Sequence, residues 1–296
     1  MKYTSALALA TLAATALFIA GCDKKGGSDK SGTTIKNVGS DTMSQLAMAW
    51  SEAYAKVNPA VSVEVNGGGS GVGIAGLIDG SVDLANASRA FEEKEIADLK
   101  AKKNLEPKEF IVGYDALSIY VHKDSPLNEI SVEQLAEIYK ADGKIRKWSD
   151  LGVTIPGAKG DDIVVISRQN NSGTQHYFKE AVIGKKNSQR ADTLNLNGSS
   201  DVVQSVGSNP NAIGYSGMAF KTPAVKVLRV SKKAGEPGVA PSIETTLDKS
   251  YPISRPMFVY TVGEPKAEVK AYIDWLLSAT GQAILKEQGY VPLPKK

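Results

Sequence analysis

Cysteine and histidine are scarce in this chain. Its 296 residues include one cysteine, Cys22, and two histidines, His122 and His176. A single cysteine excludes a disulfide framework, a thiolate zinc site and a cysteine-ligated iron–sulfur cluster. Two histidines leave little room for a histidine metal centre. We therefore expect a protein without a bound metal or cofactor.

Aromatic residues and unbalanced charge are also in short supply. Aromatics make up 7% of the chain, and 35 basic against 32 acidic side chains leave a formal net charge of +3. No basic run provides a track for a phosphate backbone, so nucleic acid is not an expected partner. With 42% hydrophobic and 23% charged residues, the composition excludes disorder and a polytopic membrane protein. The length favours two domains.

Long apolar runs are limited to the N-terminus. Residues 6–20 form a largely apolar segment after Lys2, too short for a spanning helix, and this pattern is typical of a signal peptide. The segment ends in Ile19-Ala20-Gly21-Cys22, which resembles a bacterial lipobox. We expect residues 1–21 to be removed and Cys22 to be lipidated, so that acyl chains alone hold the protein at a membrane. A plain secretory signal with a chance cysteine is the alternative.

Residues 22–32 are polar, rich in glycine and serine, and without an apolar period, which is typical of a flexible tether. Asp23, directly after the cysteine, resembles the signal that keeps Gram-negative lipoproteins at the inner membrane. We expect a folded body in the periplasm, tied to the inner membrane.

From residue 33 onward, strand-like and helix-like segments alternate, which indicates an α/β fold. Short β-branched runs predict strands at residues 35–38, 61–65, 82–85, 110–112, 117–122, 163–166, 212–215 and 257–262. Apolar residues at helical spacing predict helices at residues 43–57, 74–78, 92–102, 132–139, 174–182, 200–206 and 266–286.

Four loops share one chemical character, because each places glycine or hydroxyl-bearing residues at the end of a predicted strand. They are Val38–Thr42, Asn66–Gly73, Asn86–Arg89 and Ser167–Thr174. Ligands of open α/β sheets bind beyond the carboxyl ends of the strands, and helix N-termini attract anions. Taken singly, each loop is a weak signal, because a helix cap or a turn is an alternative explanation. Together they predict a site for a small anion held by many hydrogen bonds.

Arginine and glycine support this interpretation. Two of the six arginines, Arg89 and Arg168, fall in these loops, and a guanidinium matches the oxygens of a tetrahedral oxyanion. Five glycines between residues 66 and 73 leave backbone N–H groups open to a ligand.

Enzyme motifs are weak by comparison. Gly71–Gly76 matches the dinucleotide pattern G-x-G-x-x-G, but the predicted helix at this position is very short. The strand after that helix is followed by Ser88-Arg89, whereas a dinucleotide-binding fold has a ribose-binding acid there. The sequence contains no phosphate-binding P-loop and no nucleophile elbow. A nucleotide-using or hydrolytic enzyme remains the alternative from a different class.

In combination, these motifs resemble the phosphate-binding proteins of bacterial phosphate ABC transporters. The resemblance spans about residues 33–294 and rests on Val38–Thr42, Gly67–Gly71, Val82–Arg89 and Arg168 with Ser172–Thr174. Two further segments also match the family, Asn211–Tyr215 and Tyr251–Pro256.

The resemblance implies a two-lobed periplasmic-binding-protein fold of type II, with the ligand cleft between the lobes. Lobe 1 would comprise residues 33–114 and 256–296, and lobe 2 residues 115–255. It further implies a monomeric receptor, not an enzyme, that captures inorganic phosphate and delivers it to a membrane permease. A receptor for another oxyanion, such as sulfate, molybdate or a phosphonate, is the closest alternative.

Site residues follow from the same motifs. The resemblance assigns phosphate-binding roles to the hydroxyl, glycine and arginine residues of the four loops. These are Ser40, Asp41, Thr42, Gly69, Ser70, Ser88, Arg89, Arg168, Ser172, Gly173 and Thr174.

Two positions depart from the family pattern. Some members carry an acid where this chain has Arg89, and that acid accepts the proton of hydrogen phosphate; others carry an acid where this chain has Asn170, and it orients the arginine. A carboxylate acceptor favours phosphate, which is protonated near neutral pH, over sulfate, which is not. Asp41 is the nearest carboxylate for the proton-accepting role, and we predict that it fills it.

Overall fold

The computed structural model describes residues 32–294. The predicted leader, most of the tether, Cys22 and Asp23 therefore lie outside the described residues. Within the described part, no helix is long and apolar enough to cross a membrane.

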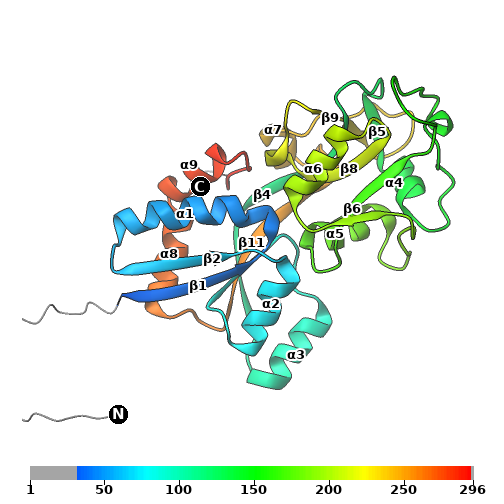
Figure 1. Cartoon of the computed structure of the whole chain (residues 1–296). Helices are drawn as coiled ribbons and strands as arrows, with labels where there is room; N and C mark the ends of the chain where they lie inside the picture. The colour runs from blue at the N-terminus through cyan, green and yellow to red at the C-terminus, as the bar shows by residue number, and fades with distance from the viewer. Residues whose placement is uncertain (1–31, 295–296) are drawn as a thin grey trace, which may run out of the picture. The chain divides into compact units, whose positions relative to one another are not determined.

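Strands and helices alternate along the described chain, as expected for an α/β fold (Figure 1). The strands are β1 Thr33–Gly39, β2 Val61–Asn66, β3 Leu84–Ala87, β4 Pro107–His122, β5 Glu129–Ser131, β6 Val164–Arg168, β7 Leu194–Leu196, β8 Ala212–Gly217, β9 Val225–Val227, β10 Arg229–Ser231 and β11 Ser254–Val262. The helices are α1 Ser44–Val57, α2 Ser70–Asp79, α3 Glu93–Lys103, α4 Val132–Tyr139, α5 Gly173–Phe178, α6 Ser199–Ser208, α7 Ile243–Leu247, α8 Ala267–Leu276 and α9 Ala279–Glu287.

Most strands belong to one hydrogen-bonded series in the order β2-β1-β3-β11-β4-β8-β6-β7, with β9 beside β4. The pairs β1–β2, β1–β3, β6–β8 and β6–β7 are parallel, because a helical segment carries the chain back between their members. β11 is antiparallel to both of its neighbours, β3 and β4. The carboxyl ends of β1, β3 and β6 lead directly into the loops singled out from the sequence.

The long strand β4 links two sets of strands. Its 16 residues pair with β11 as far as Ala116 and with β8 from Leu117 onward. β11 runs beside it in the opposite direction, with Arg255 opposite Asp115 and Ser254 opposite Ala116. The chain therefore passes along β4 from one strand set, β2-β1-β3-β11, to the other, β8-β6-β7, and it returns at the start of β11.

Hydrophobic residues cover both faces of each strand set. Successive residues on a strand point to opposite faces, and Leu84 packs in a cluster with α1 and α8 while Ala85 packs in a second cluster with α2 and α3. In Figure 1, α1 and the pair α2–α3 lie on opposite sides of β1 and β2. On β4, Ile119 packs with residues of α4 and α5, whereas Tyr120 packs with residues of α6. The loops at the strand ends therefore extend from well-packed elements.

Two helix and strand predictions differ from the structure. The strands predicted at residues 110–112 and 117–122 form one strand, β4, because β11 and β8 supply partners on either side of the expected break. The single helix predicted over residues 266–286 is two helices, and Ser278 caps the second by accepting the Gly281 N–H at 3.3 Å. The three-residue strands β5, β7, β9 and β10 and the short helix α7 were not predicted, because so few residues carry no periodic pattern.

Candidate anion-binding site

Ser40 and Thr42 follow β1 and lie at the entrance to α1. Gly39 holds a positive φ of 146°, and a Cβ there would lie 2.1 Å from the carbonyl oxygen of Asn86, so only glycine fits. This close approach lets the Ser40 N–H donate to Asn86 O at 2.8 Å, which joins the loop after β1 to β3.

Three serines from separate loops meet in a buried hydroxyl cluster. Ser40 Oγ donates to Ser88 Oγ at 3.0 Å, and Ser70 Oγ lies 3.3 Å from Ser88 Oγ. The Ser88 N–H donates to Ser70 Oγ at 3.1 Å. All three residues are buried, so each hydroxyl needs a polar partner inside the protein.

The loop after β6 brings a second group of residues to the same cluster. Ser172 caps α5 by accepting the N–H groups of Thr174 at 3.2 Å and Gln175 at 3.4 Å. Thr174 Oγ1 lies 2.8 Å from Thr42 Oγ1, across 132 residues of sequence. A Cβ on Gly173 would lie 2.2 Å from Ser70 Oγ, so glycine is required for the N-terminus of α5 to come this close.

Arg168, at the end of β6, is almost fully buried, and its partner Ser199 lies 3.5 Å from Thr42 Oγ1. Its Nη1 donates to Ser199 Oγ at 2.6 Å, and its Nη2 lies 3.2 Å from Asp41 Oδ2. The same Asp41 oxygen accepts the Ser199 N–H at 2.7 Å. Burial lowers the pKa of Arg168, and the attraction of Asp41 opposes this effect. Asp41 thus orients the arginine, the role that Asn170 does not fill.

The glycine loop contributes backbone contacts. The Gly69 N–H donates to Gly39 O at 2.9 Å, and a Cβ on Gly69 would lie 2.5 Å from Asn171 O. Gly71 N–H donates to Asn171 O at 3.1 Å, and Asn171 Nδ2 donates to Gly68 O at 2.9 Å. Gly69 therefore permits close contact between the loops, and its N–H is directed toward Gly39.

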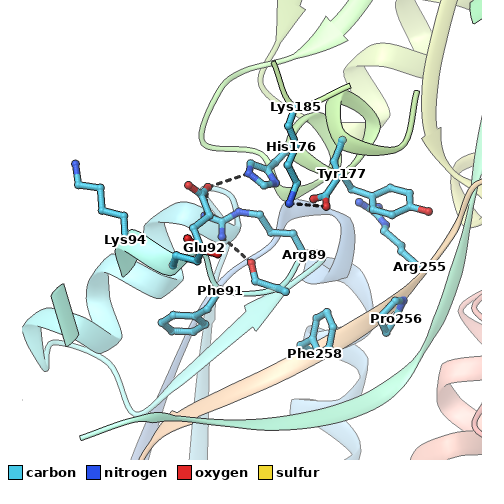
Figure 2. Close-up of a pocket in the computed structure, with 13 residues that line it drawn as sticks. Arg89, Phe91, Glu92, Lys94, His176, Tyr177, Lys185, Arg255, Pro256 and Phe258 are labelled. Carbon is cyan, nitrogen blue, oxygen red and sulfur yellow. Dashed lines mark hydrogen bonds and ion pairs between the residues drawn. The ribbon is translucent and has the colours of Figure 1, made fainter. Parts of the chain in front are cut away.

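The structure does not bring the Arg89 guanidinium into the hydroxyl cluster. Its Nη1 and Nη2 donate to the two carboxylate oxygens of Glu95, each at 2.7 Å, and Nη1 also donates to Ala90 O. Figure 2 shows Arg89 beside Glu92 and His176 on the wall of a cavity of about 720 Å³. The Arg89 side chain is therefore held by Glu95 of α3 instead of by the serine hydroxyls.

Comparison with known proteins identifies the family of the chain. Residues 25–280 match the model of a PBP superfamily domain. The phosphate-binding protein PstS of Pseudomonas aeruginosa is 34% identical over 272 residues, which cover 88% of this chain and 84% of that protein. The chain belongs to the PstS family.

Solved structures extend the comparison to the fold. A crystal structure from Clostridium perfringens that contains bound phosphate has a TM-score of 0.78 and 29% identity, and the match covers 88% of this chain and all of that one. An ABC-type phosphate transport receptor from Vibrio cholerae has a TM-score of 0.70 and 26% identity, with the same coverage. The chain thus has the two-lobed α/β fold of these binding proteins.

In this PstS-family chain, sequence reasoning missed Ser199 and Arg255, which contact Thr42 and Thr174 of the cluster, and Asp115, which pairs with Arg255. Ser199 begins α6 after Asn197-Gly198, a small polar loop of the same kind as the four that were recognised. Arg255 lies in Tyr251–Pro256, which contributed to the family resemblance but received no role. No sequence pattern marks Asp115, whose importance comes from its partner.

The chemistry of the cluster suits the binding of an oxyanion. Most of its polar groups are hydroxyls, N–H groups and guanidinium groups, which can donate hydrogen bonds to oxygen atoms. Among residues 32–294, no group of three or more histidine, cysteine or acidic side chains is arranged to hold a metal ion.

Proposed function

We propose that this protein is a receptor that binds inorganic phosphate outside the cytoplasm and delivers it to the membrane permease of an ABC transporter. It acts as a binding protein and not as an enzyme. One observation carries the proposal: hydroxyls from separate loops meet in a buried cluster, and Ser199 Oγ, 3.5 Å from Thr42 Oγ1, connects it to the buried guanidinium of Arg168. Membership of the PstS family supports phosphate as the anion.

The proposed ligands are the residues that meet in this cluster. Ser40, Thr42, Ser70, Ser172 and Thr174 would donate hydroxyl protons to phosphate oxygens, and Arg168 would supply charge-assisted hydrogen bonds. Ser172 already accepts two backbone N–H groups, so its own proton is available for a ligand. Ser88 and Gly173 support these ligands by keeping the loops at close distance.

Capture would depend on the two lobes closing over the anion. We propose lobe 1 as residues 33–114 with 256–296 and lobe 2 as residues 115–255. The contacts between Thr42 and Thr174 and between Gly68 and Asn171 would then join one lobe to the other. Closure excludes water, and the lower local dielectric strengthens each charged hydrogen bond.

Asp41 is the proposed acceptor for the proton of hydrogen phosphate. The contacts that it makes with other described residues fall on Oδ2, which leaves Oδ1 for this role. Arg89 cannot take the role because a guanidinium has no acceptor.

The location and anchoring follow from the N-terminal sequence. We propose that the mature chain begins at Cys22, that lipid on this cysteine holds it at the inner membrane facing the periplasm, and that it works as a monomer.

Calorimetric titration of the mature protein with phosphate and with sulfate tests the proposal. We expect phosphate to bind more tightly than sulfate. Arg168→Ala and Ser172→Ala should each weaken phosphate binding by about 1–3 kcal/mol, because a charged or buried partner is left unpaired. Two matched controls should bind normally: Arg229→Ala, which breaks an exposed ion pair with Glu129, and Ser242→Ala, which removes the serine cap of α7. Unchanged affinity in both site variants would remove this cluster from the binding site.

A further inference from the structure

A fully buried ion pair lies where β4 and β11 run side by side. Arg255 Nη2 and Nε lie 2.8 and 3.2 Å from Asp115 Oδ2, and the two residues are direct partners in the strand register. Their side chains are 1% and 0% exposed. The N–H of Met218 donates to the other carboxylate oxygen at 3.3 Å. A buried pair of this kind is weak support for a purely stabilising role, because removing both charges from water offsets most of their attraction.

The remaining hydrogen bonds of Arg255 go to two loops of the anion site. Nη1 donates to the carbonyl oxygen of Ser88 at 3.1 Å, and Nη2 donates to Thr174 Oγ1 at 3.0 Å. The guanidinium is also 5.6 Å from the ring centre of Tyr177, beside which Figure 2 shows it. One side chain therefore connects the loop after β3, the N-terminus of α5 and the paired strands β4 and β11.

The direction of these hydrogen bonds has a chemical consequence for Thr174. A guanidinium only donates, so Thr174 Oγ1 must accept from Arg255. The hydroxyl carries a single proton, which does not point at Arg255 and is available to Thr42 Oγ1, 2.8 Å away, or to an anion in the same cluster. Asp115 holds the guanidinium in place and balances its charge. The pair therefore fixes the direction of the hydrogen bond to Thr174 and adds little net charge to the site.

We propose that Arg255, held by Asp115, is a positioning residue that makes Thr174 a hydrogen-bond donor toward the bound anion. Because the same guanidinium binds the Ser88 carbonyl, this donation is coupled to the approach of the loop after β3 toward α5. The inference rests on the proposed function as an oxyanion receptor, and it adds a residue that does not itself need to touch the anion.

A double-mutant cycle separates this role from a merely structural one. Phosphate affinity is measured by calorimetry for the wild type, Arg255→Met, Thr174→Val and the double variant. We expect each single variant to bind about ten- to a hundredfold more weakly. We expect the double variant to bind no more than about threefold more weakly than Arg255→Met, because Arg255 acts through Thr174.

A second cycle provides the matched control. Ser172 lies in the same loop as Thr174 but makes no hydrogen bond with Arg255 among the described contacts. Arg255→Met and Ser172→Ala should therefore have multiplicative effects on affinity. Arg255→Lys, which keeps the charge, should recover part of the lost affinity. Arg229→Met should have no effect, because this arginine is exposed and paired with Glu129.

Arg255→Met leaves Asp115 buried without its partner, so thermal unfolding of each variant is measured first. If that variant does not fold, the same cycles are run with Arg255→Gln/Asp115→Asn, which removes both charges together. If the wild type binds phosphate but the effects of Arg255→Met and Thr174→Val are multiplicative, the inference is overturned while the proposed function stands. Equal coupling in the Thr174 cycle and the Ser172 cycle has the same consequence. A wild type that binds neither phosphate nor sulfate overturns the proposed function and this inference with it.

Discussion

At the scale of single residues, hydrogen-bond direction decides what the site can bind. Ser70 accepts the Ser88 N–H, Ser172 accepts two N–H groups, and Ser199 accepts from Arg168. Each of these hydroxyls has an N–H donor on its acceptor side, so its own proton faces another partner. The cluster therefore favours an anion rich in acceptor oxygens. A carboxylate, which accepts and does not donate when ionised, supplies the acceptor that a protonated anion needs.

Asp41→Asn tests that acceptor. The amide keeps the size of the side chain but replaces one acceptor oxygen by an NH₂ donor. We expect the preference for phosphate over sulfate to narrow by about tenfold or more, because only hydrogen phosphate loses a hydrogen bond. Competition titrations of both anions at pH 7 measure this ratio, with Asp192→Asn as an exposed, arginine-paired control. A preference that survives intact would place the proton acceptor elsewhere.

At the scale of elements, the N-terminus of α5 and the loop after β3 approach one another through Gly173. The space that a Cβ would occupy there is filled by Ser70 Oγ at 2.2 Å and Ser88 Oγ at 2.7 Å. Helix α5 is short, so its position depends on the strand and loop before it more than on its own stability.

Gly173→Ala should keep α5 from reaching this position. We expect phosphate affinity to fall by about tenfold or more, because the added methyl group forces the loops apart. Small-angle scattering should also show less compaction on phosphate addition than in the wild type. Gly71→Ala is the matched control, since its Cβ would meet only ordinary contacts beginning at 3.4 Å. Equal binding by both variants would contradict the requirement for glycine at residue 173.

At the scale of the whole described chain, His176 from α5 meets Glu92, which precedes α3. The distance from Nε2 to the nearer carboxylate oxygen is 3.0 Å (Figure 2). Burial and the nearby charge of Arg89 lower the pKa of His176 below its usual value of 6.5, and Glu92, itself 45% exposed, opposes this only in part. Protonation of His176 is therefore harder in the folded than in the unfolded protein.

Lowering the pH should therefore destabilise the folded protein through this histidine. Below about pH 6.5, the unfolded chain binds a proton at this histidine that the folded protein resists, so the free energy of unfolding decreases as the pH falls. Urea unfolding at pH 7.5, 6.5 and 5.5 should show a smaller loss of stability for His176→Gln than for the wild type. His122→Gln serves as the control. Identical losses in the wild type and His176→Gln would show that this histidine does not contribute.

The sequence alone was sufficient for the α/β alternation and the family, and it predicted the chemical character of the proposed site. These depend on local patterns, such as strand periodicity and glycine or hydroxyl residues at the start of a helix. Seven predicted residues meet in one cluster, namely Ser40, Thr42, Ser70, Ser88, Ser172, Gly173 and Thr174. The ends of the parallel strands β1 and β3 lie together, whereas β6 belongs to the second strand set and runs the opposite way, so that the loop after it meets theirs from the other side.

Only the tertiary structure decided which partner each charged group takes. Arg89 pairs with Glu95 instead of entering the cluster, Asp41 pairs with Arg168, and Arg255 joins Asp115 to Thr174. Asp115 and Arg255 are 140 residues apart and become neighbours only through the register of β4 and β11. A hydrogen bond depends on distance and direction between atoms in space, and residue order does not specify these across such separations.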